Sequence, residues 1–157
     1  METMKVAGPD HPIHLEAAAR RVRARYKGRV IADSDGVLML REAGYHPVAY
    51  FPRQDVSMEY LSRSERRSFC PYKGHASYFT ILMDGKLAQD AGWSYENPFP
   101  AMEVIGERIA FFPHPVEVYA AEETRLGPSP DEVVLHTDAG DGVSQDPHWP
   151  PTTQEPA

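Results

Sequence analysis

Residues 69–81 read Phe-Cys-Pro-Tyr-Lys-Gly-His-Ala-Ser-Tyr-Phe-Thr-Ile. This stretch holds the only cysteine of the chain, and a lysine, a glycine and a histidine follow it within five residues. It then passes into a strand pattern over residues 76–83, where both alternating faces carry bulky side chains. Such a pattern is typical of a β-strand that other parts of the protein cover on both sides. We therefore place these residues at the centre of the fold and search for a site there first.

Two Asp-Gly pairs predict tight turns between strands on either side of this stretch. Asp84-Gly85 is a strong signal for a two-residue β-hairpin, and residues 87–95 continue as the returning strand. Asp35-Gly36 predicts a second hairpin in the same way. The strands expected besides these cover residues 22–27, 29–34, 37–42, 48–51, 108–112 and 116–120.

The remaining segments of the body show weaker patterns. We expect a short helical turn over residues 14–20, short helices over residues 56–61 and 101–105, and a charged crossing segment over residues 63–68. Gly92 is a candidate for a β-bulge, and Arg53 with Asp55 is interpreted as a local ion pair. The sequence therefore predicts a mainly β protein: a single compact antiparallel β domain with one or two short helices.

The composition predicts where this domain begins and ends. Residues 1–12 contain Gly8, Pro9 and Pro12 without an apolar period, which predicts a flexible N-terminal arm before a β domain over residues 13–122. Residues 123–157 are rich in proline and acidic residues and poor in large apolar ones, which predicts a disordered tail. The net charge of −7 lies almost wholly in that tail, because residues 1–120 carry equal numbers of basic and acidic side chains.

Charge, hydropathy and cysteine content argue against several classes of protein. A neutral body with an acidic tail lacks the basic surface that binds nucleic acid, so we expect no nucleic-acid partner. No apolar run approaches the ~20 residues of a membrane span, and we expect no membrane association. One cysteine and the absence of an apolar signal segment at the N-terminus favour a cytoplasmic, bacterial-type protein.

The order of five motifs resembles the bacterial "domain of unknown function 427" family over about residues 11–120. The motifs are Ile31-Ala32-Asp33-Ser34, the run from Pro47 to Val56, Cys70-Pro71-Tyr72-Lys73-Gly74, Trp93-Ser94-Tyr95-Glu96-Asn97-Pro98 and Ile109-Ala110-Phe111-Phe112. The resemblance implies a compact β fold of the Mss4-like, or β-tent, kind and implies no biochemistry. The family's catalogue label hints at nucleotidyl transfer, but we find no glycine-rich phosphate loop and no paired acids for two metals.

The leading functional hypothesis is a small-molecule-binding β domain with a pocket of lysine and aromatic side chains. Gly74 can bring backbone N–H groups close to a ligand, and Lys73 adds a positive charge for an anionic group. Trp93 and Tyr95 are two residues apart and face the same side of a strand, and the hairpin pairs that strand with the strand of Tyr78. The three rings could line an apolar wall for a ligand, and ordinary core packing is the alternative. The expected ligand is small and anionic or aromatic, and its binding residues are Tyr72, Lys73, Gly74, Tyr78, Trp93 and Tyr95.

Two functions other than ligand binding remain open at this stage. Cys70 is a candidate nucleophile or redox thiol if Lys73 favours the thiolate, whereas a buried Cys70 is an ordinary packing residue. An interaction module is the third function, with the acidic tail as a recruiting arm. The family often has a small residue where this chain has His75, so any role for His75 is particular to this chain. The histidine spacing and single cysteine predict no metal site, and the sequence assigns no cofactor.

Overall fold

The computed structural model describes residues 4, 5 and 7–121, which form ten β-strands and three short 3₁₀ helices. No helix in this part of the chain is long and apolar enough to cross a membrane. The elements are β1 (Ile13–Ala17), β2 (Val22–Tyr26), β3 (Arg29–Ser34), β4 (Leu38–Glu42), β5 (Val48–Tyr50), η1 (Arg53–Asp55), η2 (Met58–Tyr60), β6 (Leu61–Cys70), β7 (Gly74–Met83), β8 (Lys86–Ser94), η3 (Pro100–Ile105), β9 (Ala110–Phe111) and β10 (Glu117–Ala120).

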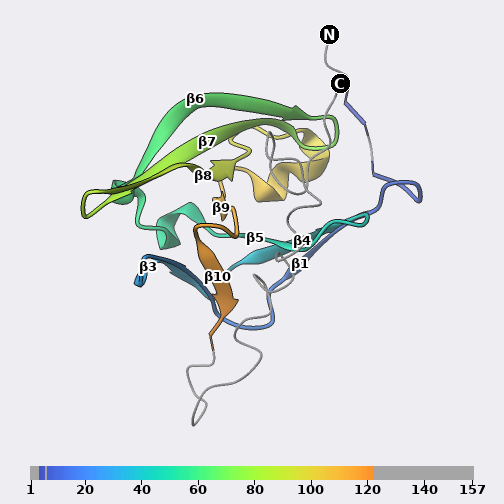
Figure 1. Cartoon of the computed structure of the whole chain (residues 1–157). Helices are drawn as coiled ribbons and strands as arrows, with labels where there is room; N and C mark the ends of the chain where they lie inside the picture. Colours follow the sequence, from blue (N-terminus) through green and yellow to red (C-terminus); the bar gives the residue numbers. More distant parts are fainter. Residues whose placement is uncertain (1–3, 6, 122–157) are drawn as a thin grey trace.

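The strands form three antiparallel sheets. The strand orders are β1-β4-β5, β10-β2-β3 and β6-β7-β8-β9, and the last sheet lies across the other two (Figure 1). Phe51 and Ile109 exchange backbone hydrogen bonds of 2.8 and 2.9 Å, which tie the end of β5 to the start of β9. Ala32 forms a bridge with Val56 and joins β3 to the segment between η1 and η2. The fold is thus mainly β and antiparallel, as the sequence predicts.

The central strand β7 changes the face that it buries halfway along its length. Ala76 and Tyr78 are buried on one side, but Phe79 and Ile81 belong to a different group of buried residues. The pairing with β6 shifts between Arg63 and Arg67, and the pairing with β8 shifts between Phe79 and Ile81. Extra residues in a partner strand bend and twist a sheet locally. These irregularities let one strand cover two separate clusters of buried side chains.

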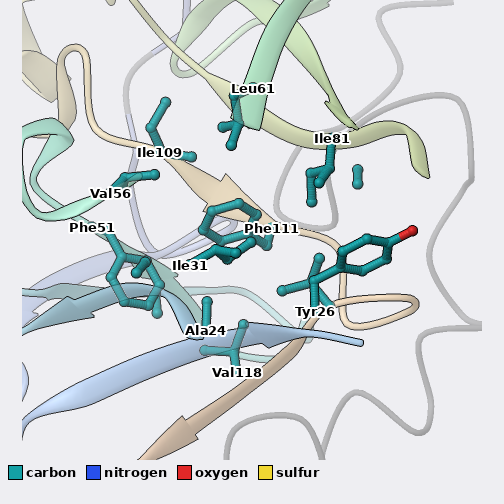
Figure 2. Packing of buried hydrophobic residues seen from close by; sticks show 14 of the residues in the cluster. Ala24, Tyr26, Ile31, Phe51, Val56, Leu61, Ile81, Ile109, Phe111 and Val118 are labelled. Atoms are coloured by element: carbon teal, nitrogen blue, oxygen red, sulfur yellow. The ribbon is translucent and has the colours of Figure 1, made fainter. Parts of the chain in front are cut away.

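The first of these, which we name the apolar cluster, lies between β2, β3 and β10 on one side and β7 to β9 on the other (Figure 2). Phe51 is fully buried in it, and its ring meets that of Phe111 edge to face at 5.8 Å. Tyr26 alone among the buried members of this cluster carries a polar side-chain atom. The other labelled members in Figure 2 are Ala24, Ile31, Val56, Leu61, Ile81, Ile109 and Val118.

The Asp84-Gly85 hairpin is confirmed, because β7 and β8 pair directly on either side of it. Both turn residues have positive φ angles, 53° for Asp84 and 76° for Gly85, as a tight hairpin turn with right-handed strand twist requires. The hairpin predicted at Asp35-Gly36 is wrong. β4 follows this turn but pairs with β1 and β5, whereas β3 pairs with β2. The turn therefore carries the chain from one sheet to another.

Three other local expectations need correction or refinement. Residues 13–17 form β1 and not a helical turn, because the strand β4 pairs with them along their whole length. Residues 63–68, expected as a charged crossing, lie inside the ten-residue edge strand β6. Gly92 pairs with Phe79, and the register irregularity of β8 lies directly before it, between Ala88 and Gly92. A Cβ at Gly92 would lie 3.1 Å from the carbonyl oxygen of Ala110, so close packing also requires this glycine.

The domain boundaries stay predictions. The expected disordered tail falls almost wholly outside the described residues, as do residues 1–3 and 6 of the expected arm. The described part of that arm nevertheless contacts the domain. Lys5 donates a backbone hydrogen bond of 2.7 Å to the carbonyl oxygen of Pro71, and His11 is only 6% exposed.

Candidate functional site

The predicted aromatic residues meet in a second cluster of buried side chains, which we name the aromatic cluster. Tyr78 and Trp93 are directly opposed across β7 and β8, and Tyr95 follows on the same face as Trp93. All three are fully buried. The Trp93 indole N–H donates a 3.2 Å hydrogen bond to the hydroxyl of Tyr50 from β5. The pairing of β7 with β8 that the sequence predicts, together with the register shift between Phe79 and Ile81, therefore assembles these rings. They fill an interior and do not form an open wall.

Lys73 lies at the edge of this cluster, in the turn between β6 and β7. Its backbone N–H bonds to the carbonyl oxygen of Cys70 at 3.2 Å, which closes the turn, and its own carbonyl accepts a 3.0 Å bond from the Phe99 N–H. Gly74 follows with φ of 114°, a conformation that side-chain-bearing residues rarely adopt. A Cβ there would lie 3.4 Å from the Cα of Pro98, so Gly74 also permits close packing.

The ammonium group of Lys73 is fully buried and is paired with Glu42. Its Nζ donates to Glu42 Oε1 at 2.6 Å, and both side chains are 0% exposed. Glu42 is the last residue of β4, so the pair joins the β1-β4-β5 sheet to the β6-β7 turn. Buried charges are tolerated only when they are paired and hydrogen-bonded, and this pair meets that condition.

His11 is a third member of this network, and the sequence analysis missed it. Its Nε2 contacts the second carboxylate oxygen of Glu42, so one carboxylate bridges an imidazole and an ammonium group. The ring of Tyr72 stacks on His11 with 4.0 Å between ring centroids and 9° between planes. His11 lies 31 residues before Glu42, and Glu42 lies 31 residues before Lys73. No local spacing in the sequence could therefore indicate the network.

The hydroxyl of Tyr95 is buried, and no group among the described residues hydrogen-bonds to it. Lys73 Nζ lies 5.9 Å from the centroid of the Tyr95 ring, which places the hydroxyl-bearing ring beside the buried ion pair. Burial raises the pKa of Tyr95 well above its ordinary value, and the nearby Cys70, Tyr50, Tyr78 and Glu42 raise it further. Tyr95 therefore keeps its proton and is a hydrogen-bond donor.

Cys70 and His75 differ in exposure. Cys70 is fully buried within the aromatic cluster, an environment that suits a packing role. His75 is exposed, and its ring lies 5.0 Å from that of Phe69 on the neighbouring strand. Whether Cys70 reacts, and whether His75 has a role, stay predictions.

Tyr78 has its own polar partner at the far end of the cluster. Its hydroxyl shares a 2.8 Å hydrogen bond with Ser68 on β6, and the guanidinium of Arg66 lies 4.3 Å from the ring centroid. Burial raises the pKa of Tyr78, although the hydrogen bond with Ser68 and the charge of Arg66 oppose the change. Tyr78 is thus a neutral member of the cluster whose hydroxyl is already satisfied.

The expected ion pair between Arg53 and Asp55 is wrong. Arg53 bonds to Ser94 at 3.2 Å and to Glu96 at 3.1 Å, whereas Asp55 accepts a 2.6 Å bond from the Ser34 hydroxyl.

Glu96 joins two arginines near the surface, because Arg63 on β6 also bonds to the carboxylate that Arg53 contacts. Burial alone would raise the pKa of Glu96, but hydrogen bonds from Arg63 and Ser77 and the charges of both arginines lower it overall. These contacts are structural links between β6, η1 and the end of β8. Within residues 4, 5 and 7–121, no three histidine, cysteine or acidic side chains lie together as a metal site would require.

The protein is a compact antiparallel β domain of three sheets with two clusters of buried side chains. One of these clusters lies against the buried ion pair of Lys73 and Glu42. A family model described as "Domain of unknown function (DUF427)" matches residues 14–122. The chain belongs to this family, and the resemblance based on the five motifs is confirmed. A search of the curated proteins gives no match.

Proposed function

We propose that this protein binds a small molecule at the junction of Lys73 and Tyr95. The ligand carries a hydrogen-bond-accepting anionic group and a flat apolar body. Lys73 and the Tyr95 hydroxyl hold the anionic group, while Trp93 and Tyr78 pack against the body. Gly74 and Tyr72 shape the turn that borders the site.

The unpaired hydroxyl of Tyr95 is the observation that supports this proposal best. Buried polar groups are almost always hydrogen-bonded, and a buried donor without a partner costs about 1–3 kcal/mol. The raised pKa of Tyr95 keeps the hydroxyl protonated, so its partner must be an acceptor. An acceptor oxygen of a ligand would remove this cost and would gain affinity from doing so.

The Lys73 ammonium lies beside the Tyr95 ring and suits an anionic, hydrogen-bond-accepting group. Glu42 already pairs its carboxylate with this ammonium and with the His11 imidazole. Titratable groups that a protein gathers and buries at one place are common at functional sites. The same interior contains several aromatic rings, whose faces suit a flat ligand.

The expected location and partners are part of this proposal. The neutral charge of residues 1–120 supports a ligand other than nucleic acid, and the lone cysteine supports a reducing, cytoplasmic location. A bacterial source and action away from membranes belong to the same proposal. Catalysis through Cys70 and an interaction role for the tail are predictions that no contact described above favours. Alkylation of Cys70 by iodoacetamide, with and without denaturant, tests the first of them.

The test compares Tyr95→Phe with the wild type. Native mass spectrometry of protein purified from cells looks for a retained small molecule, and two-dimensional NMR then follows titration with benzoate and larger aromatic carboxylates. We expect Tyr95→Phe to fold with equal or greater stability, because it removes an unpaired polar group, and to lose the ligand-induced shifts.

Tyr26→Phe is the matched control, because Tyr26 is equally buried but belongs to the apolar cluster. This variant should keep the ligand response of the wild type. If Tyr95→Phe binds as the wild type does, Tyr95 does not contact the ligand. If neither a retained molecule nor a shift is found with the wild type, the proposal is wrong.

A further inference from the structure

We infer that residues 7–12 form a removable cover over the Glu42–Lys73 pair and that His11, stacked on Tyr72, is its latch. The purpose of such a cover rests on the proposed function, because a ligand would reach Lys73 only when the cover moves away. The movement itself is a separate property that needs no ligand for its detection.

The exposure of successive residues falls along one path from the surface to the pair. Tyr72 is partly exposed, His11 is 6% exposed, and Glu42 and Lys73 are 1% and 0% exposed. Each member contacts the next: Tyr72 stacks on His11, His11 contacts Glu42, and Glu42 pairs with Lys73. His11 therefore lies between the buried pair and the partly exposed ring of Tyr72.

The backbone of the cover is attached to the domain near its two ends, where Lys5 bonds to Pro71 and Ala43 bonds to Pro12, and few backbone hydrogen bonds hold it in between. Gly8 and His11 bond to each other at 2.9 and 3.3 Å, which forms a local turn and does not attach the segment to a sheet. Pro9 and Pro12 have no N–H to donate, although the Pro12 carbonyl accepts a 2.9 Å bond from Ala43 where β1 begins. Segments with few such bonds open at a low free-energy cost compared with the whole domain.

The groups beneath the cover are held much more firmly. Glu42 ends β4 and pairs with Ile13 of β1, and Lys73 lies in a turn closed by bonds to Cys70 and Phe99. Opening therefore moves His11 and leaves the Glu42–Lys73 pair in place. His11 contacts Glu42 through its side chain, so a single substitution addresses the latch.

Acetylation of lysines, followed by peptide mass spectrometry, measures the opening in the protein without ligand. The rate at Lys73 is divided by that at Lys86, an exposed lysine beside the β-hairpin turn. We expect His11→Ala to raise this ratio at least about tenfold, because it removes a contact with a charged partner. His14→Ala, which changes an exposed histidine on β1, should leave the ratio unchanged.

The urea dependence of Lys73 labelling in the wild type provides a second measurement that does not depend on a variant. Local opening exposes little surface, so the rate should rise weakly with urea at low concentrations, whereas labelling through global unfolding rises steeply. The cover is overturned if the labelling rate of Lys73 rises steeply with urea at all concentrations. It is also overturned if His11→Ala leaves the ratio of the Lys73 and Lys86 labelling rates unchanged. If Lys73 is labelled as expected but no ligand response is found, the cover is supported and the proposed function is rejected. If a ligand response is found but the labelling does not behave as expected, the proposed function is supported and the cover is rejected.

Discussion

The apolar cluster and the aromatic cluster share the strand β7 but differ in chemistry. The apolar cluster consists of aliphatic and phenyl side chains apart from Tyr26. The aromatic cluster includes four side chains with N–H or O–H groups and lies against the buried pair of Glu42 and Lys73. Apolar burial stabilises a fold without requiring any particular partner, whereas each buried polar group needs one. The comparison teaches that stability and candidate function occupy different halves of this domain.

Phe51→Ala should have the largest effect on stability. Phe51 is fully buried in the apolar cluster and meets Phe111, so truncation loses its burial and leaves a cavity, which costs about 4 kcal/mol. Urea unfolding followed by tryptophan fluorescence measures the change. Phe51→Leu is the conservative control and should cost about 1.5 kcal/mol or less. A loss below 1 kcal/mol for Phe51→Ala would mean that the apolar cluster is not the main source of stability.

Lys73→Met should cost about 3 kcal/mol, because it leaves the carboxylate of Glu42 buried with His11 as its remaining described ionic partner. The double variant Glu42→Gln with Lys73→Met should recover most of this loss, because it removes both charges together. Chemical denaturation of the four proteins in the double-mutant cycle gives the coupling free energy. Strictly additive losses would show that the two groups do not act as a pair.

Gly74→Ala should cost about 2 kcal/mol, because alanine is strained at φ of 114° and its Cβ would meet Pro98. Gly85→Ala is the matched change at the other end of β7, where φ is 76° and a Cβ has open space, and should cost about 1 kcal/mol. Thermal unfolding compares the two variants. Equal losses of stability in the two variants would show that the contact with Pro98 at Gly74 adds no cost beyond the backbone strain.

Glu96 should give the smallest effect, and it depends on pH. Its folded-state pKa is lowered from the ordinary value of 4.5, so its stabilising contribution is complete above pH 4.5 and is lost as the pH falls through the folded-state pKa. The contribution is below about 1 kcal/mol because the group is partly exposed and solvent screens its ion pairs. Arg63→Gln should flatten this part of the stability curve, while Arg67→Gln, on the same strand, should not. Equal curves for both variants would contradict the assignment.

Local signals predicted those parts of the fold that neighbouring residues determine. The Asp84-Gly85 turn correctly indicated that the strand of Tyr78 pairs with the strand of Trp93. The direct opposition of Tyr78 and Trp93 was not predictable from the turn, because the pairing shifts between Phe79 and Ile81. The same dipeptide type at Asp35-Gly36 misled the prediction, because a turn signal does not specify which sheet the next strand joins. The charged strand β6 was missed because edge strands can carry charges on exposed positions and then lose the apolar alternation.

The candidate site was predictable only where its residues lie close together in sequence. Lys73, Gly74 and the rings stand in one hairpin and its preceding turn, so their types and spacing indicated a common location. Glu42 and His11 come from other parts of the chain, and their partners are set by how separate sheets meet. Sequence spacing also could not reveal that Glu42 neutralises Lys73.

The change of buried face along β7 couples the stability of the apolar cluster to that of the aromatic cluster. The ten residues of β7 contribute side chains to both the apolar cluster and the aromatic cluster. Unfolding of either cluster would therefore remove packing contacts from the other. The domain should consequently melt in one cooperative transition with a single calorimetric peak. A molecule held near Lys73 would then slow amide exchange as far away as Ile81, and remote protection would become a sensitive reporter of occupancy.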